Sequence, residues 1–179
     1  MEPCEECGFQ PATVAHGEAP SLIRRLARQH RDWLIGMAAT ESGDAAIRAH
    51  PRKGLWSPLE YTAHVRDVYA LFDRRIQAIL NSPGSELEII DHNIAVAEGG
   101  YNRLEAPALA EDLVVRADRL AATLDHVRPW QWSLRGFRGA ESRTVEEIAK
   151  RAVHEGRHHL MDVERMTTSG AERALRPRS

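Results

Sequence analysis

Four segments of the chain repeat apolar residues every three or four positions, and this spacing limits the fold more than any other feature of the sequence. The segments cover about 20–39, 57–80, 107–126 and 144–167. The third is the clearest, with Leu109, Leu113, Leu120 and Leu124 on one stripe. No segment alternates apolar and polar residues convincingly, as a half-buried strand would. The sequence therefore predicts an all-α protein, a four-helix bundle.

The starts of two helices carry a second, more local signal. Ser57 is followed by Pro58 and Glu60, and Thr144 stands three residues before Glu147. Both stretches match the capping box, in which the hydroxyl and the carboxylate each accept a backbone N–H of the other residue. The connections at 40–56 and 81–106 are long for a bundle, and long loops often carry function. We expect a short additional helix within 88–99.

Length and composition indicate one globular domain. The 179 residues, 42% of them apolar and 28% charged, can bury a core without further cross-links. We expect an N-terminal arm at 1–19, the bundle at 20–168 and a tail at 169–179. The tail has too few apolar residues to pack, so we expect it to be mobile.

The charge balance and the apolar runs exclude several kinds of partner. A net charge of −2 lacks the basic surplus that nucleic-acid binding requires. No run approaches the roughly 20 apolar residues of a membrane span. The N-terminal residues are acidic and lack the apolar stretch of a secretory signal. We therefore expect a cytoplasmic protein with no nucleic-acid or membrane partner. Assembly as a homodimer stays open.

The last predicted helix contains a short metal-binding pattern. His154, Glu155 and His158 match H-E-x-x-H, which holds zinc in metalloproteases with the glutamate as general base. Three interpretations compete: a protease site, another kind of metal site, and a solvated polar face of the helix. The protease is disfavoured, because the few residues after His158 offer no well-placed third ligand and no sheet is predicted to bind an extended peptide.

The position of these histidines on the helix favours the solvated face. The apolar residues Ile148, Ala152 and Leu160 share one side, whereas His154 and His158 fall near the opposite side. A metal site would need that polar face to line a cleft, or to be covered by a loop or by another subunit.

The spacing of the histidines favours a metal site. His154 and His158 are four residues apart, so their imidazoles stack on one helix face and can chelate one ion. A third candidate is His64, six residues after Pro58 on the second helix. Among the other histidines, His30 sits among apolar residues and is expected in the core. The remaining ones are expected at the surface: His16, His50, His92 and His126. Of these, His92 could still face the site.

The start Trp56-Ser57-Pro58, the histidine that follows and the late His-x-x-x-His helix resemble the DinB-like superfamily of four-helix bundles. The resemblance covers about 20–167 and omits the N-terminal arm. It implies one metal ligand on the second helix and two on the fourth, here His64, His154 and His158, holding a divalent metal such as zinc or nickel. The group includes thiol-dependent S-transferases and, more distantly, mycothiol-dependent maleylpyruvate isomerases. A low-molecular-weight thiol such as mycothiol is therefore an expected cofactor.

Further residues are expected around that site. Metal-bound histidines usually donate their second ring N–H to a carboxylate or carbonyl. Asp67 and Asp162 lie one turn from His64 and His158 and are candidates for this orienting role, with His159 as a packing or supporting neighbour. Glu155 and Tyr101 are candidate catalytic residues. A set of three imidazoles would leave coordination positions open, as catalytic metal sites do.

The arm contains the two cysteines of the chain, Cys4 and Cys7, in a C-x-x-C motif. A structural zinc site needs four ligands, and there is no second C-x-x-C. The pair could borrow histidines such as His16 or His50, bind zinc between subunits or act as a redox pair. It could also be two reduced thiols in a loosely ordered arm.

The sequence favours a metal-dependent enzyme that brings a thiol or a water to a small electrophilic molecule. S-transfer, thiol-assisted isomerisation and hydrolysis all remain open. The alternative is a helical bundle without catalytic activity, whose metal or cysteine arm serves dimerisation or a stress response.

Overall fold

Four long helices form the body of the molecule. The computed structural model describes residues 1–174, and side chains up to residue 168. Within that range there are six α-helices: α1 (Ala19–Ala38), α2 (Glu41–Arg48), α3 (Pro58–Asn81), α4 (His92–Gly99), α5 (Ala106–Asp125) and α6 (Val145–Ala174). Strands β1 (Arg135–Arg138) and β2 (Glu141–Thr144) pair antiparallel. Four 3-10 turns complete the described elements: Pro11–Thr13, His16–Glu18, Tyr101–Arg103 and Pro129–Ser133.

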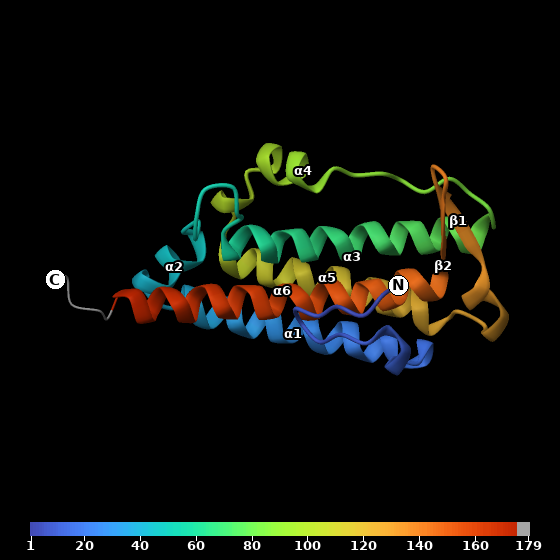
Figure 1. Ribbon diagram of the computed structural model, residues 1–179, viewed down its shortest axis with the longest axis horizontal. Helices are drawn as coiled ribbons and strands as arrows, with labels where there is room; N and C mark the ends of the chain where they lie inside the picture. Colours follow the sequence, from blue (N-terminus) through green and yellow to red (C-terminus); the bar gives the residue numbers. More distant parts are fainter. Residues whose placement is uncertain (175–179) are drawn as a thin grey trace.

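Helices α1, α3, α5 and α6 make the bundle. Helix α1 packs against α5 and α6, and α3 packs against the same two helices, so α1 and α3 lie on opposite corners (Figure 1). Helices α3 and α5 run in the same direction along the bundle (Figure 1). The connection between them therefore has to return along its whole length, and it does so beside α3 before it forms α4. This crossover explains one of the long loops of the sequence.

The predicted helices and their starts are confirmed. The Ser57 hydroxyl accepts the Glu60 N–H at 3.2 Å, and the Glu60 carboxylate accepts the Ser57 N–H at 2.8 Å. Thr144 and Glu147 make the same reciprocal pair at the start of α6, at 3.1 and 2.8 Å. The short helix expected within 88–99 is α4. Helix α2, in the first long connection, was not predicted.

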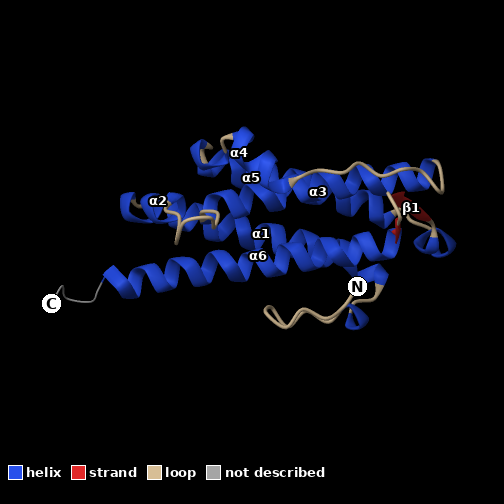
Figure 2. Cartoon of the chain, turned by 45° about the horizontal axis from the view of Figure 1, so that its top comes forward, coloured by secondary structure: helices blue, strands red, loops and turns tan. Residues whose placement is uncertain are grey.

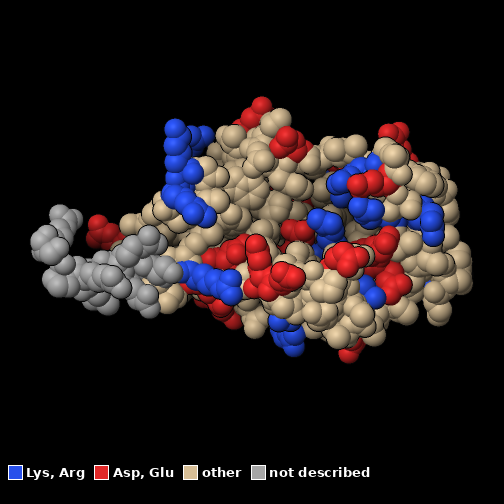
Figure 3. Space-filling model, in the orientation of Figure 1, with Lys and Arg blue, Asp and Glu red and all other residues tan. Residues whose placement is uncertain are grey.

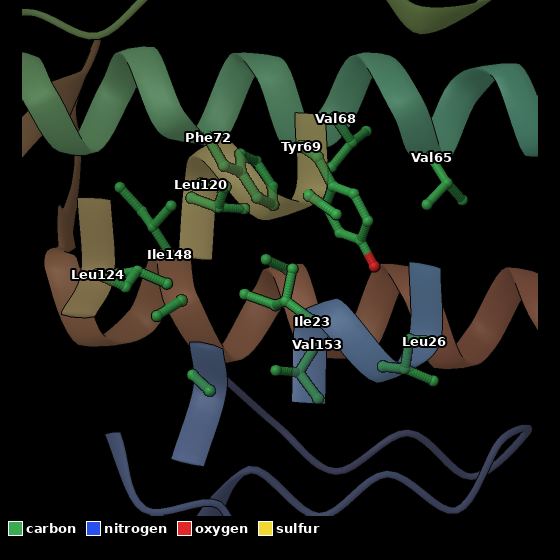
Figure 4. Close-up of a cluster of buried hydrophobic side chains, with 14 of the residues drawn as sticks. Ile23, Leu26, Val65, Val68, Tyr69, Phe72, Leu120, Leu124, Ile148 and Val153 are labelled. Atoms are coloured by element: carbon green, nitrogen blue, oxygen red, sulfur yellow. The ribbon is translucent and has the colours of Figure 1, made fainter. Parts of the chain in front are cut away.

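The core lies between the four long helices. Tyr69, Phe72 and their neighbours on α3 point toward side chains of the other three helices (Figure 4). Tyr69 is fully buried, and its hydroxyl meets helix α6 at Gly156, where a Cβ atom would collide with it. A glycine at position 156 therefore lets α6 approach α3 closely.

The expectation of no strands was wrong for residues 135–144. The hairpin escaped detection because its strands have four residues each and carry few apolar side chains. Strand β1 is bound by the returning segment, the connection at residues 82–105 between α3 and α5. The Phe137 N–H donates to the Ser85 carbonyl, and the Leu87 N–H donates to the Phe137 carbonyl. These backbone bonds fix the hairpin beside the start of the long connection, just after the end of α3 (Figure 1).

The arm keeps the place expected of it before α1, whereas the expected tail is shorter. The N-terminal arm lies against the bundle beside α6, with Cys7, Phe9 and Val14 buried (Figure 2). Helix α6 continues to Ala174, so residues 169–174 of the expected tail are helical, and 175–179 lie outside the described residues. Within the described part of the chain, no helix combines the length and apolar character that crossing a membrane requires.

Candidate metal centre

His64 lies at the centre of the candidate site. It lies in the second turn of α3 and is only 6% exposed. Its ring lies 5.1 Å from those of Trp56 and His159 and 4.6 Å from that of His92, measured between centroids. The capping box of α3 fixes the start of the helix and so the position of His64 along the bundle axis. The returning segment brings His92, the first residue of α4, over it.

Helix α6 supplies two partners for His64. Glu155 and His159 are four residues apart, so they share the face of α6 that looks toward α3. The Nε2 of His64 lies 3.6 Å from the Glu155 carboxylate, and the Nε2 of His159 lies 3.3 Å from the same oxygen. One ligand atom from each of these three residues lies within 4.8 Å of the other two, a grouping able to hold a metal ion. We call these residues the histidine–glutamate cluster.

A carboxylate orients one imidazole of the histidine–glutamate cluster. The Nδ1 of His159 lies 3.0 Å from the Asp162 carboxylate, which leaves Nε2 directed at Glu155. This is the arrangement of a metal-binding histidine held by an outer carboxylate. Two imidazoles and one glutamate are also a donor set of catalytic zinc sites, in which further positions stay open. The side chains present therefore fit a divalent metal.

The charges inside the cluster are strongly coupled. Burial raises the pKa of Glu155, but the hydrogen bonds from His159 and His64 outweigh it and hold that pKa well below its usual range. Burial lowers the pKa of His159, whereas Asp162 and Glu155 raise it, with the net result of about 9. The cluster thus pairs an ionised carboxylate with a protonated imidazole, and a bound metal ion would take the place of that proton.

A cavity opens beside the cluster. It has a volume of about 170 Å³ and reaches His64, Glu155 and His92. Its apolar wall consists of Val68, Phe72, Leu87 and Ile148. Four arginines and one further carboxylate line the rest: Arg75, Arg138, Arg143, Arg151 and Glu147. In Figure 3 basic and acidic side chains gather over the part of the surface where α3, α6 and the hairpin meet.

The arginines give this cavity an excess of positive charge. Burial lowers the pKa of Arg75, and the neighbouring charge of Arg138 lowers it further. Among the described residues Arg75 has no carboxylate partner and donates instead to the Glu88 carbonyl at 3.0 Å. Arg138 and Arg143 share the exposed Glu141, at 3.2 and 2.7 Å. Arg75 is therefore available to an anion in the cavity.

The three histidines predicted as one ligand set fall into two clusters. His64 joins Glu155 and His159, whereas His154 and His158 group with Cys4 and Cys7 of the N-terminal arm. The division follows from helix geometry, since neighbouring residues point about 100° apart around the axis. The polar face that carries His154 and His158 is covered by the arm and does not face α3.

The other predicted site residues are placed as follows. Asp67 accepts a hydrogen bond from Tyr101 and one from Arg66 at 2.7 Å, and no bond to His64 is formed. Both Asp67 and Tyr101 line a second cavity that also touches His64. Asp162 does orient a histidine, His159, and also lies 3.5 Å from His158.

The remaining histidines largely follow the predictions. His30 is fully buried in the core and bonds to the Gly156 carbonyl at 2.9 Å. His16 stacks on Trp132, and His50 pairs with Glu60. His92 does face the site, as was left open. The arginine-lined cavity was missed, because its residues come from α3, α6 and a hairpin that the sequence did not predict.

The fold and the histidine–glutamate cluster define a class of protein: a four-helix bundle with a candidate metal centre between two of its long helices, open to a cavity. The sequence profile of the DinB superfamily matches residues 35–163. The chain therefore belongs to the DinB superfamily. A comparison with curated protein sequences finds no significant match.

Two solved structures share the fold. YfiT from Bacillus subtilis, described as a probable metal-dependent hydrolase with an unusual four-helix bundle topology, superposes with a TM-score of 0.76 at 14% identity, covering 91% of this chain and 94% of that one. The mycothiol-dependent maleylpyruvate isomerase superposes with a TM-score of 0.66 at 16% identity, covering 87% of this chain and 63% of that one. At these identities the likeness is one of fold.

Proposed function

We propose that this chain is a divalent-metal-dependent enzyme acting on a small anionic electrophile. The observation that carries the proposal is the position of the histidine–glutamate cluster at the wall of an arginine-lined cavity. His64, Glu155 and His159 would hold the metal, with zinc or nickel as the expected ion. Such an ion supplies Lewis-acid chemistry and lowers the pKa of a water or thiol bound to it.

The side chains around the cavity define what the substrate must look like. Arg75, together with Arg138 and Arg143, favours a carboxylate or a similar anion, because a guanidinium binds such groups with paired hydrogen bonds. The apolar wall would contact the uncharged part of the substrate and keep water away from it. Asp162 keeps His159 oriented, and the cavity places the bound anion next to the cluster.

Two nucleophiles are consistent with this arrangement. A low-molecular-weight thiol is favoured by the likeness to the mycothiol-dependent isomerase, which supports S-transfer or isomerisation. Water is favoured by the likeness to YfiT, which extends over nearly the whole of both chains and supports hydrolysis. We place the thiol first, in agreement with the resemblance seen in the sequence. Peptide hydrolysis through H-E-x-x-H is not supported, because Glu155 points to a different cluster from His154 and His158.

The test is a screen that separates charge from reactivity. Unsaturated and 2-oxo carboxylates, each paired with its uncharged methyl ester, are offered with mycothiol, with glutathione or with water alone. We expect turnover of acids in preference to esters, and loss of turnover when the metal is removed by a chelator. Equal turnover of acid and ester, or turnover that survives metal removal, would contradict the proposal.

A matched pair of variants connects the screen to the cavity. Arg75→Met should raise KM for the acid about 10-fold or more, because a hydrogen bond to a charged group contributes roughly 1.5–3 kcal/mol. Arg116→Met is the control, since Arg116 lies on α5 and pairs with Asp112 on its own helix. An unchanged KM in Arg75→Met would contradict the proposal that the cavity binds an anionic substrate.

A further inference from the structure

The N-terminal arm is attached to the bundle at a defined place. Phe9 is 2% exposed and its ring lies 5.4 Å from that of His154. Cys7 is buried as well, and Cys4 is partly buried beside it. The Cys4 N–H donates to the Phe9 carbonyl at 2.9 Å, which closes the turn that contains both cysteines. The turn needs Gly8, whose φ of +66° favours glycine. The arm thus presents both thiols to helix α6.

Four metal-ligating side chains meet where this turn touches α6. One ligand atom each from Cys4, Cys7, His154 and His158 lies within 4.8 Å of the other three. The Cys4 sulfur is 3.6 Å from the Nδ1 of His158. Two thiols and two imidazoles are the donor set of tetrahedral structural zinc sites, and a C-x-x-C turn is a frequent source of their thiolates.

Two further observations point to a ligand at this place. Among the described residues the buried Nε2 of His154 has no hydrogen-bond partner, which is unfavourable for a buried polar atom. On His158, the ring nitrogen opposite the thiol lies 3.5 Å from Asp162 and 3.4 Å from Glu6. Outer carboxylates of this kind orient histidines that bind metal through their other nitrogen.

We infer that Cys4, Cys7, His154 and His158 bind a structural zinc ion that fastens the N-terminal arm to helix α6. Four protein ligands complete a tetrahedral shell, so this site offers no open position for a substrate. It differs in this respect from the histidine–glutamate cluster, which has three ligands and adjoins a cavity. A disulfide between the two cysteines would leave His154 without a partner, whereas one zinc ion satisfies all four groups.

The site has a structural consequence that can be measured. The metal would connect residues that are 154 positions apart in the sequence. Because such a site exists only in the folded chain, the free energy of metal binding adds to the stability of the fold. Removal of the metal should therefore release the arm from α6 and expose the thiols.

The experiment compares three proteins: the wild type, the double variant Cys4→Ser/Cys7→Ser, and Glu5→Ser as a control for substitution within the same turn. Elemental analysis should find one zinc per chain fewer in the double variant and no loss in Glu5→Ser. After cobalt substitution, thiolate-to-cobalt charge-transfer absorption should appear in the wild type and in Glu5→Ser only. Equal zinc content in all three proteins, or no charge-transfer absorption in the wild type, would overturn the inference.

A measurement on the unmodified chain covers the case in which the double variant fails to fold. The two thiols of the wild type should react slowly with a thiol reagent and quickly once a strong chelator is added. A fast reaction without chelator would overturn the inference equally. The variant His64→Ala distinguishes this site from the candidate catalytic one, because it should keep the charge-transfer absorption whether or not the histidine–glutamate cluster binds metal.

Discussion

Helix α6 carries two pairs of residues that differ by a single position, and the two pairs lead to different chemistry. Glu155 and His159 face α3, meet His64 and lie beside a cavity. His154 and His158 face the N-terminal arm and meet two cysteines. The first group has three potential ligands beside a cavity, and the second has four, enough to complete a tetrahedral shell. Ligand number and surroundings, more than the presence of histidines, separate a candidate catalytic centre from a candidate structural one.

The largest effect is expected from removing one ligand of each group in turn. His64→Ala should lose the metal of the histidine–glutamate cluster and lower kcat/KM by 100-fold or more, about 2.7 kcal/mol or more. Cys7→Ser should lose the other metal and lower the melting temperature while keeping activity. The measurements are metal content, kcat/KM and thermal unfolding. Loss of activity in Cys7→Ser comparable to that in His64→Ala would show that the cysteine group is also needed for catalysis.

A substitution at Gly156, which lies in α6 between the residues of the two groups, should lower the stability of the fold through packing. Gly156→Ala places a methyl group against the buried Tyr69 hydroxyl, and overpacking of this kind costs about 2 to 3 kcal/mol. Denaturant unfolding would measure the loss. Adding Tyr69→Phe, which removes the oxygen that the methyl group meets, should recover much of it. If the double variant is no more stable than Gly156→Ala, the contact is not the cause.

Acid should weaken the fold through a histidine that belongs to neither group. Burial lowers the pKa of His30 to about 4, below the value of about 6.5 in an unfolded chain. As the pH falls below 6.5 the unfolded state takes up the proton first, so stability is lost down to about pH 4. Between pH 7.5 and 5 the loss is about 2 kcal/mol. His30→Gln should remove this part of the pH dependence, seen as converging unfolding free energies of variant and wild type at low pH.

The smallest effect is expected at Asp162, which lies next to a histidine of each group. Asp162→Asn should weaken metal binding by the histidine–glutamate cluster about 10-fold, because His159 loses its orienting carboxylate. The cysteine site should change less, since Asp162 is 3.5 Å from His158 and Glu6 also lies there. Competition with a chelator for each metal gives the two affinities. Equal weakening of both sites would mean that Asp162 does not distinguish them.

The sequence predicts the fold well because helical periodicity and capping boxes are local signals. The four long helices, the starts at Ser57 and Thr144 and the short helix α4 all follow from neighbouring residues. The β1–β2 hairpin does not, since it depends on backbone bonds to residues 85 and 87 from a distant segment. Helix α2 carries too short an apolar pattern to be recognised.

The candidate site was predicted only in part, because its partners are chosen in three dimensions. Spacing alone cannot separate His154 and His158 from Glu155 and His159, as both pairs are four residues apart. The signal that could have separated them is the helical wheel: His154 and His158 lie opposite the apolar side, while His159 lies near it and so faces the bundle. The N-terminal arm covers the polar face of α6 that carries His154 and His158. Local sequence patterns could not predict this contact, because the arm and α6 are far apart in the sequence.

We infer that helix α6 holds two metals on adjacent faces, and the metal content of two variants at neighbouring positions tests this most directly. The wild type should contain two equivalents per chain after purification without chelators. His158→Ala and His159→Ala should each contain one, and after cobalt substitution only His159→Ala should keep the thiolate charge-transfer absorption. One equivalent in the wild type that both variants lose alike would contradict the claim.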